Sequence, residues 1–133
     1  MSDQSDADLI LFRVLLRCPE YPVIILSADR LRTATDLQSL AMACVQSTPH
    51  DGKSHVTAVD ATGSEFWYSQ ESYVISPGFI FKKWTKKRLI DLYNQSVNAR
   101  DTGVMYSDRS LGNKPFVRVF TDLCSLIEQS AGV

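Results

Sequence analysis

The chain has 133 residues, of which 44% are hydrophobic and 22% charged, and its formal net charge is −1. This length is typical of one domain, so a single domain over residues 1–133 is expected. The composition is close to the globular average and excludes wholesale disorder, low-complexity sequence and collagen-like structure. The balanced charge excludes a chain that is basic throughout.

The first eight residues carry three acids and no base. This start lacks the basic region of a secretory signal and the acid-poor composition of a mitochondrial one. The longest apolar stretch, residues 9–16, contains Arg13 and is far shorter than a bilayer span. These features predict a cytoplasmic protein without membrane contact.

Residues 6–17 are apolar apart from the acids of the first turn and two arginines, Arg13 and Arg17, which lie four apart. The spacing predicts a helix with a narrow polar strip, and a strand is the alternative because a continuous apolar run fits both. A helix that is apolar on most sides must be buried against other parts of the protein or against a second chain. The 6–17 segment is therefore expected to pack into the core or to form a contact between two copies of the chain.

Pro19 and Pro22 break the chain before an uninterrupted, mostly β-branched run. This run predicts a central strand near 22–27 that is buried on both faces. Thr35 and Gln38 then match a capping box, and apolar residues follow at helical spacing (Leu37, Leu40, Ala41, Cys44 and Val45). A helix over about 35–47 is predicted.

Between residues 54 and 81, short β-rich runs alternate with turn signals. Residues 55–59 and 65–68 flank a loop with Gly63 and predict a β-hairpin. Residues 73–75 predict a third strand of the meander, with 79–81 as an extension. Strand alternation sends Trp67 to one face of the sheet and its neighbours Phe66 and Tyr68 to the other.

Thr85 is predicted to cap a helix to about residue 98, with Lys87, Asp91, Asn94 and Asn98 on its solvent side. Residues 99–114 have no clear period and predict a functional loop or a short strand at 104–106. A last helix is predicted from about residue 115 to 129, because an apolar stripe recurs there at helical spacing: Phe116, Val119, Phe120, Leu123 and Ile127.

The predicted order is helix, strand, helix, three strands and two helices. It predicts an α+β fold with two layers, in which about four helices pack on a mixed or antiparallel sheet of four to five strands. The central strand near 22–27 and the meander 54–81 make up this sheet.

Cysteines and histidines give no pattern of a reactive site. Cys18, Cys44 and Cys124 are far apart and form no C-x-x-C motif, and the last two are predicted as small buried side chains. His50 and His55 lie five apart, which fits no metal-binding spacing on a helix or strand. The glycine patterns of dinucleotide and phosphate-loop sites are missing. No catalytic residue, metal or cofactor is predicted, and a non-enzymatic role is favoured.

Five of the seven residues 82–88 are cationic, at the predicted start of a helix. A helix N-terminus prefers acids, so the cluster conflicts with the local preference and indicates a binding surface. Its residues are Lys82, Lys83, Trp84, Lys86, Lys87 and Arg88. The alternative is that Trp84 belongs to the core and that Asp60, Glu65 and Glu71 neutralise the cations.

Residues 99–114 contain a second candidate anion site, made of Arg100, Arg109, Asn113 and Lys114. Arginines beside a helix N-terminus could hold a carboxylate or a phosphate. The alternative is an ordinary polar loop with local Asp–Arg pairs.

Three functions follow as hypotheses. The first is a small intracellular, non-enzymatic protein that binds an acidic protein partner, as an adaptor, inhibitor, immunity or regulatory module, and that could form a homodimer through 6–17. The second is nucleic-acid binding through 82–88, which a pI of about 6.1 disfavours. The third is a small enzyme or ligand-binding domain with its site at the 99–114 loop.

Overall fold

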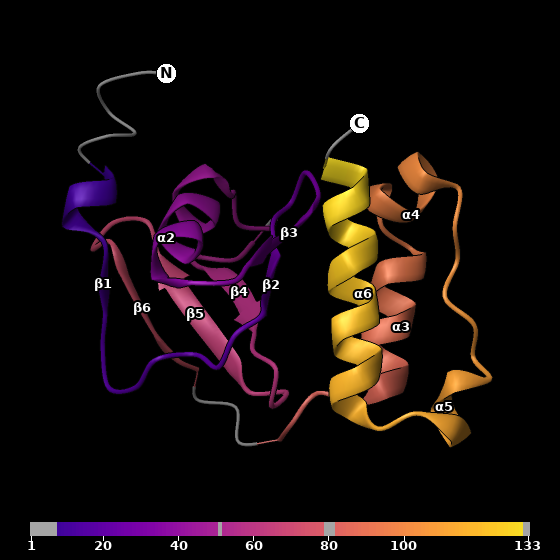
Figure 1. Ribbon diagram of the computed structural model, residues 1–133. Helices are drawn as coiled ribbons and strands as arrows, with labels where there is room; N and C mark the ends of the chain where they lie inside the picture. Colours follow the sequence, from indigo (N-terminus) through magenta and orange to yellow (C-terminus); the bar gives the residue numbers. More distant parts are fainter. Residues whose placement is uncertain (1–7, 51, 79–81, 132–133) are drawn as a thin grey trace.

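The computed structural model describes residues 8–50, 52–78 and 82–131 (Figure 1). Within these residues the strands form one six-stranded sheet in the order β1-β6-β5-β4-β2-β3. The β1–β6 pair is parallel and the other pairs are antiparallel. The strands are β1 (Arg13–Val14), β2 (Val23–Leu26), β3 (Leu31–Ala34), β4 (Val56–Val59), β5 (Glu65–Ser69) and β6 (Val74–Pro77).

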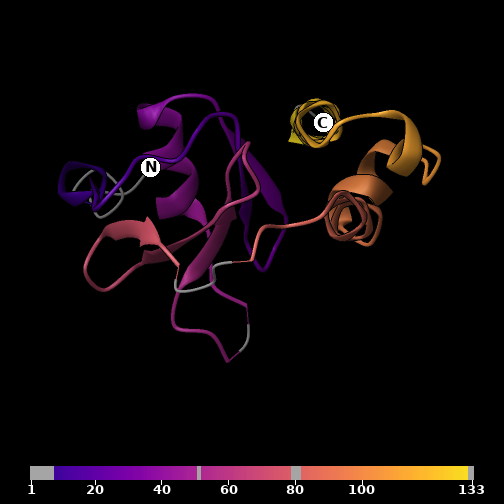
Figure 2. The same cartoon turned by 90° about the horizontal axis from the view of Figure 1, so that it is seen from below.

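The helices lie in two groups (Figures 1 and 2). One helix, α2, packs on the sheet near β2 and β3, whereas α3, α4 and α6 form a layer of their own beside β3. Residues 8–11 form a short helix before β1. The bounds of the others are α2 (Leu37–Gln46), α3 (Lys86–Asn94), α4 (Val97–Thr102), α5 (Ser110–Asn113) and α6 (Phe116–Ala131). No helix in the described ranges is long and apolar enough to cross a membrane.

Strand alternation divides the buried residues into two cores. Val23 and Ile25 face α2, while Ile24 and Leu26 pack with α3, α4 and α6. The α+β class and a mixed sheet are confirmed. The expected two layers and four to five strands are wrong, because helices cover both faces near β2 and because β1 and β3 add strands at the two edges.

The predicted helix over 6–17 is also wrong. Among its described residues only 8–11 are helical, and Arg13–Val14 form the edge strand β1. The Arg13 and Leu15 N–H groups donate to the Tyr73 and Ile75 carbonyls, at 2.9 Å each. An apolar run is compatible with a helix or a strand. The strand forms here because the edge of β6 offers carbonyls that accept its N–H groups.

The helix predicted over 35–47 is confirmed as α2, but its cap lies one residue later. Asp36 is the N-cap, and its carboxylate accepts the Ser39 N–H at 2.7 Å. The Ser39 hydroxyl accepts the Asp36 N–H at 3.1 Å, which completes a capping box with serine in place of the expected Gln38. Both hydroxyl and amide side chains can close this box, so the sequence offered two registers.

The central strand and the hairpin are confirmed as β2, β4 and β5. Phe66 and Tyr68 are buried on the α2 face, and Trp67 lies on the opposite face, stacked on His55 with ring centroids 4.4 Å apart. The third strand is β6, which begins one residue later and ends two residues later than the expected 73–75. The proposed extension at 79–81 lies outside the described residues.

The helix predicted from Thr85 to about residue 98 is interrupted. It ends with α3 at Asn94, and the Ser96 hydroxyl accepts the Ala99 N–H at 3.2 Å to cap α4. This break turns Asn98 inward, so its predicted place on the solvent side is wrong: its exposed fraction is 0%. Residues 104–106 form no strand, and the last helix is confirmed as α6.

Candidate functional site

The cationic cluster 82–88 lies at the start of α3, as its sequence predicts. The Thr85 hydroxyl accepts the Arg88 N–H at 3.1 Å, so the helix begins in the middle of the cluster. Its exposed cations are Lys82, Lys83, Lys87 and Arg88, which we call the cationic surface. Lys86 is half-buried and Trp84 is buried, so neither belongs to it.

Four of the five cations of the cluster, all except Lys82, have a partner among the described residues, and each contacts a different kind of group. Lys87 forms an ion pair with Asp91, with Nζ 3.1 Å from Oδ2, and this pair raises the pKa of Lys87. Lys83 donates to the hydroxyls of Thr62 and Ser64, at 3.1 and 2.6 Å. Among the described residues, Lys87 is therefore the one cation of this surface that is paired with a carboxylate of its own chain.

The acids of the meander bind other groups. Asp60 is fully buried and accepts backbone N–H groups, and buried Glu65 accepts two indole N–H groups. These are Trp67 Nε1 at 2.7 Å and Trp84 Nε1 at 3.0 Å. The alternative in which Asp60, Glu65 and Glu71 neutralise the cations is wrong. Asp60 and Glu65 are already occupied by neutral donors, and among the described residues Glu71 has no cation within ion-pair distance.

Trp84 connects the cationic surface to the core. Trp84 is 5% exposed as a residue, so it packs in the core, as the second of the two sequence hypotheses expects, and its ring offers no free face to a base or a partner. Arg88 covers the ring, with its guanidinium carbon 3.7 Å from the ring centroid. Stacking of this kind holds a guanidinium in a fixed place while it stays accessible to anions.

Lys86 has a structural role. Its ammonium donates to the carbonyls of Leu111 and Lys114, the second at 2.8 Å. These carbonyls belong to the end of α5 and to the connection into α6, where backbone carbonyls lack helical partners. Lys86 therefore holds the 110–115 segment against the start of α3.

The second predicted anion site, made of Arg100, Arg109, Asn113 and Lys114, is dispersed. Arg100 lies on α4 and Asn113 on α5, and Figure 1 shows these helices at opposite ends of the helical layer. Arg109 and Asn113 are exposed, and Lys114 is paired with Asp122 at 3.0 Å. The four side chains do not face a common point.

The loop before α6 is held by a network centred on Asp122. The Tyr106 hydroxyl donates to Asp122 at 2.7 Å, and Lys114 and Arg118 donate at 3.0 and 3.1 Å. These contacts hold the pKa of Asp122 below its ordinary value of 3.8, chiefly through the tyrosine bond. The loop that the sequence assigns to function is thus fastened to α6.

Acid should release this loop. A carboxyl whose pKa is lower in the folded than in the unfolded state stabilises the fold above 3.8, and this contribution is lost as the pH falls through the folded value. At neutral pH we expect Asp122→Asn to lower the free energy of unfolding by about 1 kcal/mol. Urea unfolding should show this difference shrinking as the pH falls below 3.8. A difference that is constant with pH would contradict the network.

A hollow of about 270 Å³ is lined by Arg100, which belongs to the 99–114 segment of the third hypothesis, and by His50. It lies between the β2–β3 turn and the start of α4, and Ser27 and Asp29 line it as well. It therefore touches the predicted 99–114 segment only at Arg100, which lies on α4. Its volume is slightly below the range of about 300–1,000 Å³ typical of small-molecule sites.

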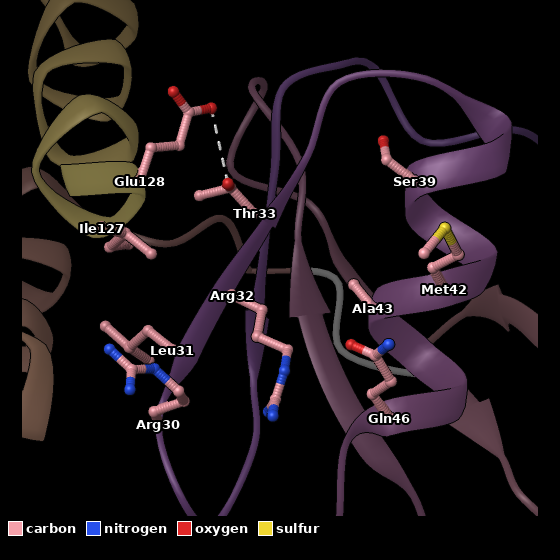
Figure 3. A pocket seen from close by; sticks show the side chains of 10 residues that line it. All are labelled: Arg30, Leu31, Arg32, Thr33, Ser39, Met42, Ala43, Gln46, Ile127 and Glu128. Atoms are coloured by element: carbon pink, nitrogen blue, oxygen red, sulfur yellow. Dashed lines mark hydrogen bonds between the residues drawn. The ribbon is translucent and has the colours of Figure 1, made fainter. Parts of the chain in front are cut away.

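A larger groove of about 400 Å³ runs along β3, between α2 and α6 (Figure 3). We call it the β3 groove. Met42, Ala43 and Gln46 line its α2 wall, and Ile127 and Glu128 line its α6 wall. The Thr33 hydroxyl faces Glu128, with the two oxygens 3.5 Å apart. Sequence reasoning missed this groove because it missed β3.

The thiols agree with their predicted core positions. Cys44 and Cys124 are buried, and burial raises the pKa of each thiol to about 12. Thiols of such high pKa are poor nucleophiles. No group of three His, Cys, Asp or Glu side chains in the described part of the chain is arranged to hold a metal ion.

Comparisons with known proteins give no relative. No family model matches the sequence, no curated protein is significantly similar to it, and no solved structure matches the fold.

Proposed function

We propose that this chain acts by binding another protein, and that acidic groups of the partner contact the cationic surface. The observation that carries the proposal is that three exposed cations, Lys82, Lys83 and Arg88, have no carboxylate partner among the described residues. Together with Lys87 they gather at one helix start, where the macrodipole adds further positive potential. This combination attracts carboxylates.

Two cations of this surface are fixed before any partner arrives. Arg88 is stacked on the buried ring of Trp84, and Lys83 is held by the hydroxyls of Thr62 and Ser64. Side chains that are already ordered lose little conformational entropy on binding. A guanidinium also pairs with a carboxylate through two parallel hydrogen bonds. These features favour a specific acidic partner over a diffuse counterion layer.

Nucleic acid is the alternative partner. Phosphates would be attracted by the same cations, but the tryptophan that would have stacked on a base is buried beneath Arg88. The formal net charge of −1 also differs from the strongly basic domains that bind nucleic acids. We therefore favour an acidic protein.

The contact between two copies remains part of the proposal in altered form. The segment around β1 exposes Ile10 at 81% and Leu16 at 90%, and Leu11 and Leu15 are exposed as well. Exposed apolar groups that cluster in this way favour a protein contact. The contact would use an edge strand and its flanks instead of the expected helix.

Charge reversal tests the main proposal. We expect the double variant Lys83→Glu, Arg88→Glu to weaken binding of an acidic partner by about 100-fold, because each contact changes from attraction to repulsion. Partners retained from a cell lysate on the wild-type protein would be purified, and their affinities measured against both forms. Lys53→Glu is the matched control, since Lys53 is exposed and lies outside the cationic surface.

Three results decide the matter. Acidic proteins that bind the wild type and Lys53→Glu but not the double variant support the proposal. Partners that bind all three forms equally contradict it. Retention that disappears when the lysate is treated with nuclease, and that a mixed-sequence DNA or RNA restores, assigns the surface to nucleic acid instead.

A further inference from the structure

We propose that the β3 groove binds a short extended segment of another polypeptide, which pairs with the backbone of Thr33 and directs a basic side chain at Glu128. This proposal goes beyond the proposed function, because it concerns a different surface. The cationic surface lies near the start of α6, where Lys86 contacts the carbonyl of Lys114, whereas Glu128 lies near the end of that helix.

The backbone argument starts from Leu31. Its N–H donates to Asn98 Oδ1 at 2.8 Å, and its carbonyl accepts from Asn98 Nδ2 at 3.0 Å. Leu31 therefore directs both groups away from β2. In an antiparallel pair the direction of the backbone groups alternates from residue to residue. The N–H and carbonyl of Arg32 therefore point toward β2, and those of Thr33 again point away from it. Among the described residues, no hydrogen bond to the outward N–H or carbonyl of Thr33 is found.

Asn98 shows what this edge accepts. Its carboxamide presents one acceptor and one donor to Leu31, as a residue of a neighbouring strand would. On the other side of Thr33, the Thr35 N–H donates to the Ser39 hydroxyl at 2.9 Å. The edge is thus closed at both ends by side chains and open at Thr33, which limits the incoming segment to a short stretch.

The walls of the groove specify the chemistry of that segment. Arg32 is paired with Asp29, and Arg30 with Asp101. Among the described residues Glu128 has no cation within ion-pair distance. A basic side chain on the α6 side would supply the missing charge.

Neighbouring residues of an extended segment point to opposite sides. The side chain next to the basic one therefore lies on the α2 wall, where Met42 and Ala43 present apolar surface. The groove accordingly selects adjacent basic and apolar residues. In strand addition at a sheet edge, main-chain bonds supply affinity and such side-chain sites supply specificity.

A second copy of this chain does not fit the groove. Its own Thr33 lies equally deep between α2 and α6, as Figure 3 shows for one copy. Two edges that each lie at the bottom of a groove cannot meet, whereas a segment one strand wide can enter. The occupant is therefore an extended part of another polypeptide.

Selection from a display library of random twelve-residue peptides tests the proposal. We expect enriched peptides to share a basic residue next to an apolar one. Thr33→Pro should weaken their binding about tenfold or more, because proline removes the outward N–H and leaves the bonds to β2 intact. Thr33→Val is the matched control, since it keeps the N–H, and should change the affinity less than about twofold. Glu128→Gln should weaken binding and relax the basic preference.

Modified peptides test the same backbone contact on the wild-type protein, so the test stands even if Thr33→Pro does not fold. Methylation of the peptide nitrogen that donates to the Thr33 carbonyl should weaken binding to the wild-type protein, whereas methylation of the next nitrogen should not. The variant Lys83→Glu, Arg88→Glu should bind these peptides normally, so the two proposals can fail separately. Failure to enrich any peptide, or equal binding to Thr33→Pro and Thr33→Val, would overturn the inference. So would a wild-type dimer, detected by sedimentation, that Thr33→Pro dissociates.

Discussion

Replacing Asn98 with alanine is expected to lower the free energy of unfolding by about 3 kcal/mol. The side chain is fully buried and holds three groups: the Leu31 N–H and carbonyl, and the Ser130 hydroxyl at 2.7 Å. Alanine leaves the two Leu31 groups without a partner in a site closed to water, whereas the Ser130 hydroxyl still donates to the Ile127 carbonyl. Each unpaired buried group costs about 1–3 kcal/mol, and partial relaxation reduces the sum. Urea unfolding followed by circular dichroism measures the loss.

Asn94 provides a matched comparison for this experiment. Its carboxamide accepts the Tyr106 N–H at 2.8 Å and donates to the Tyr106 carbonyl at 3.0 Å, so it makes the same two-bond contact with a backbone. Asn94 is only half-buried, and water can replace it there. We expect Asn94→Ala to cost about 1 kcal/mol. Equal losses in the two variants would contradict a special role for Asn98 at the edge of β3.

The isosteric change Asp60→Asn is expected to cost about 2 kcal/mol. Asp60 Oδ1 accepts the N–H groups of Thr62 and Ser64, both at 3.0 Å, and Oδ2 accepts the Glu20 N–H at 3.0 Å. Asparagine keeps the shape but offers an NH₂ group where one oxygen stood, so a donor then faces a donor. The β4–β5 turn and the segment before β2 lose their common acceptor. Thermal and urea unfolding both report this change.

Asp91→Asn is the control for that variant. Asp91 pairs with Lys87 on the surface, and the lysine side chain of this pair is 67% exposed. Exposed pairs of this kind contribute little, so we expect a change of less than about 0.5 kcal/mol. If both substitutions cost the same, Asp60 would not organise the turn as its hydrogen bonds indicate.

Elements with strong periodic patterns could be predicted from the sequence. This holds for α6 with its apolar stripe, for β2 with its β-branched run and for the hairpin around Gly63. In each, several residues favour the same conformation over any other. β3 was missed because Leu31–Ala34 is four residues long and contains Arg32 and Thr33. Asp29 in the turn after β2 was the available signal for a second hairpin. The strand conformation of β3 depends on its hydrogen bonds with β2, and these cannot be recognised from the local sequence.

The candidate site was predictable only in part, for a similar reason. The positions of the cations follow from local capping at Thr85, and the sequence locates them correctly at the start of a helix. Their partners come from distant segments: Thr62 for Lys83 and Leu111 for Lys86. The burial of Trp84 depends on Gly63, whose carbonyl accepts the Trp84 N–H at 2.9 Å. Such pairings appear only when the chain is folded.

The parallel pairing of β1 with β6 bears on how the protein is made. Arg13 pairs with Val74, and the outward backbone N–H of Leu31 binds Asn98, so each partner lies more than 60 residues later in the chain. β1 and the outward backbone groups of Leu31 therefore lack these partners while the ribosome is still adding the residues that supply them. Contacts between such distant parts of a chain form late, since a long loop must close first. The amino-terminal segments thus leave the exit tunnel with unpaired strand edges, and strand β6 and helix α4 supply the missing partners later.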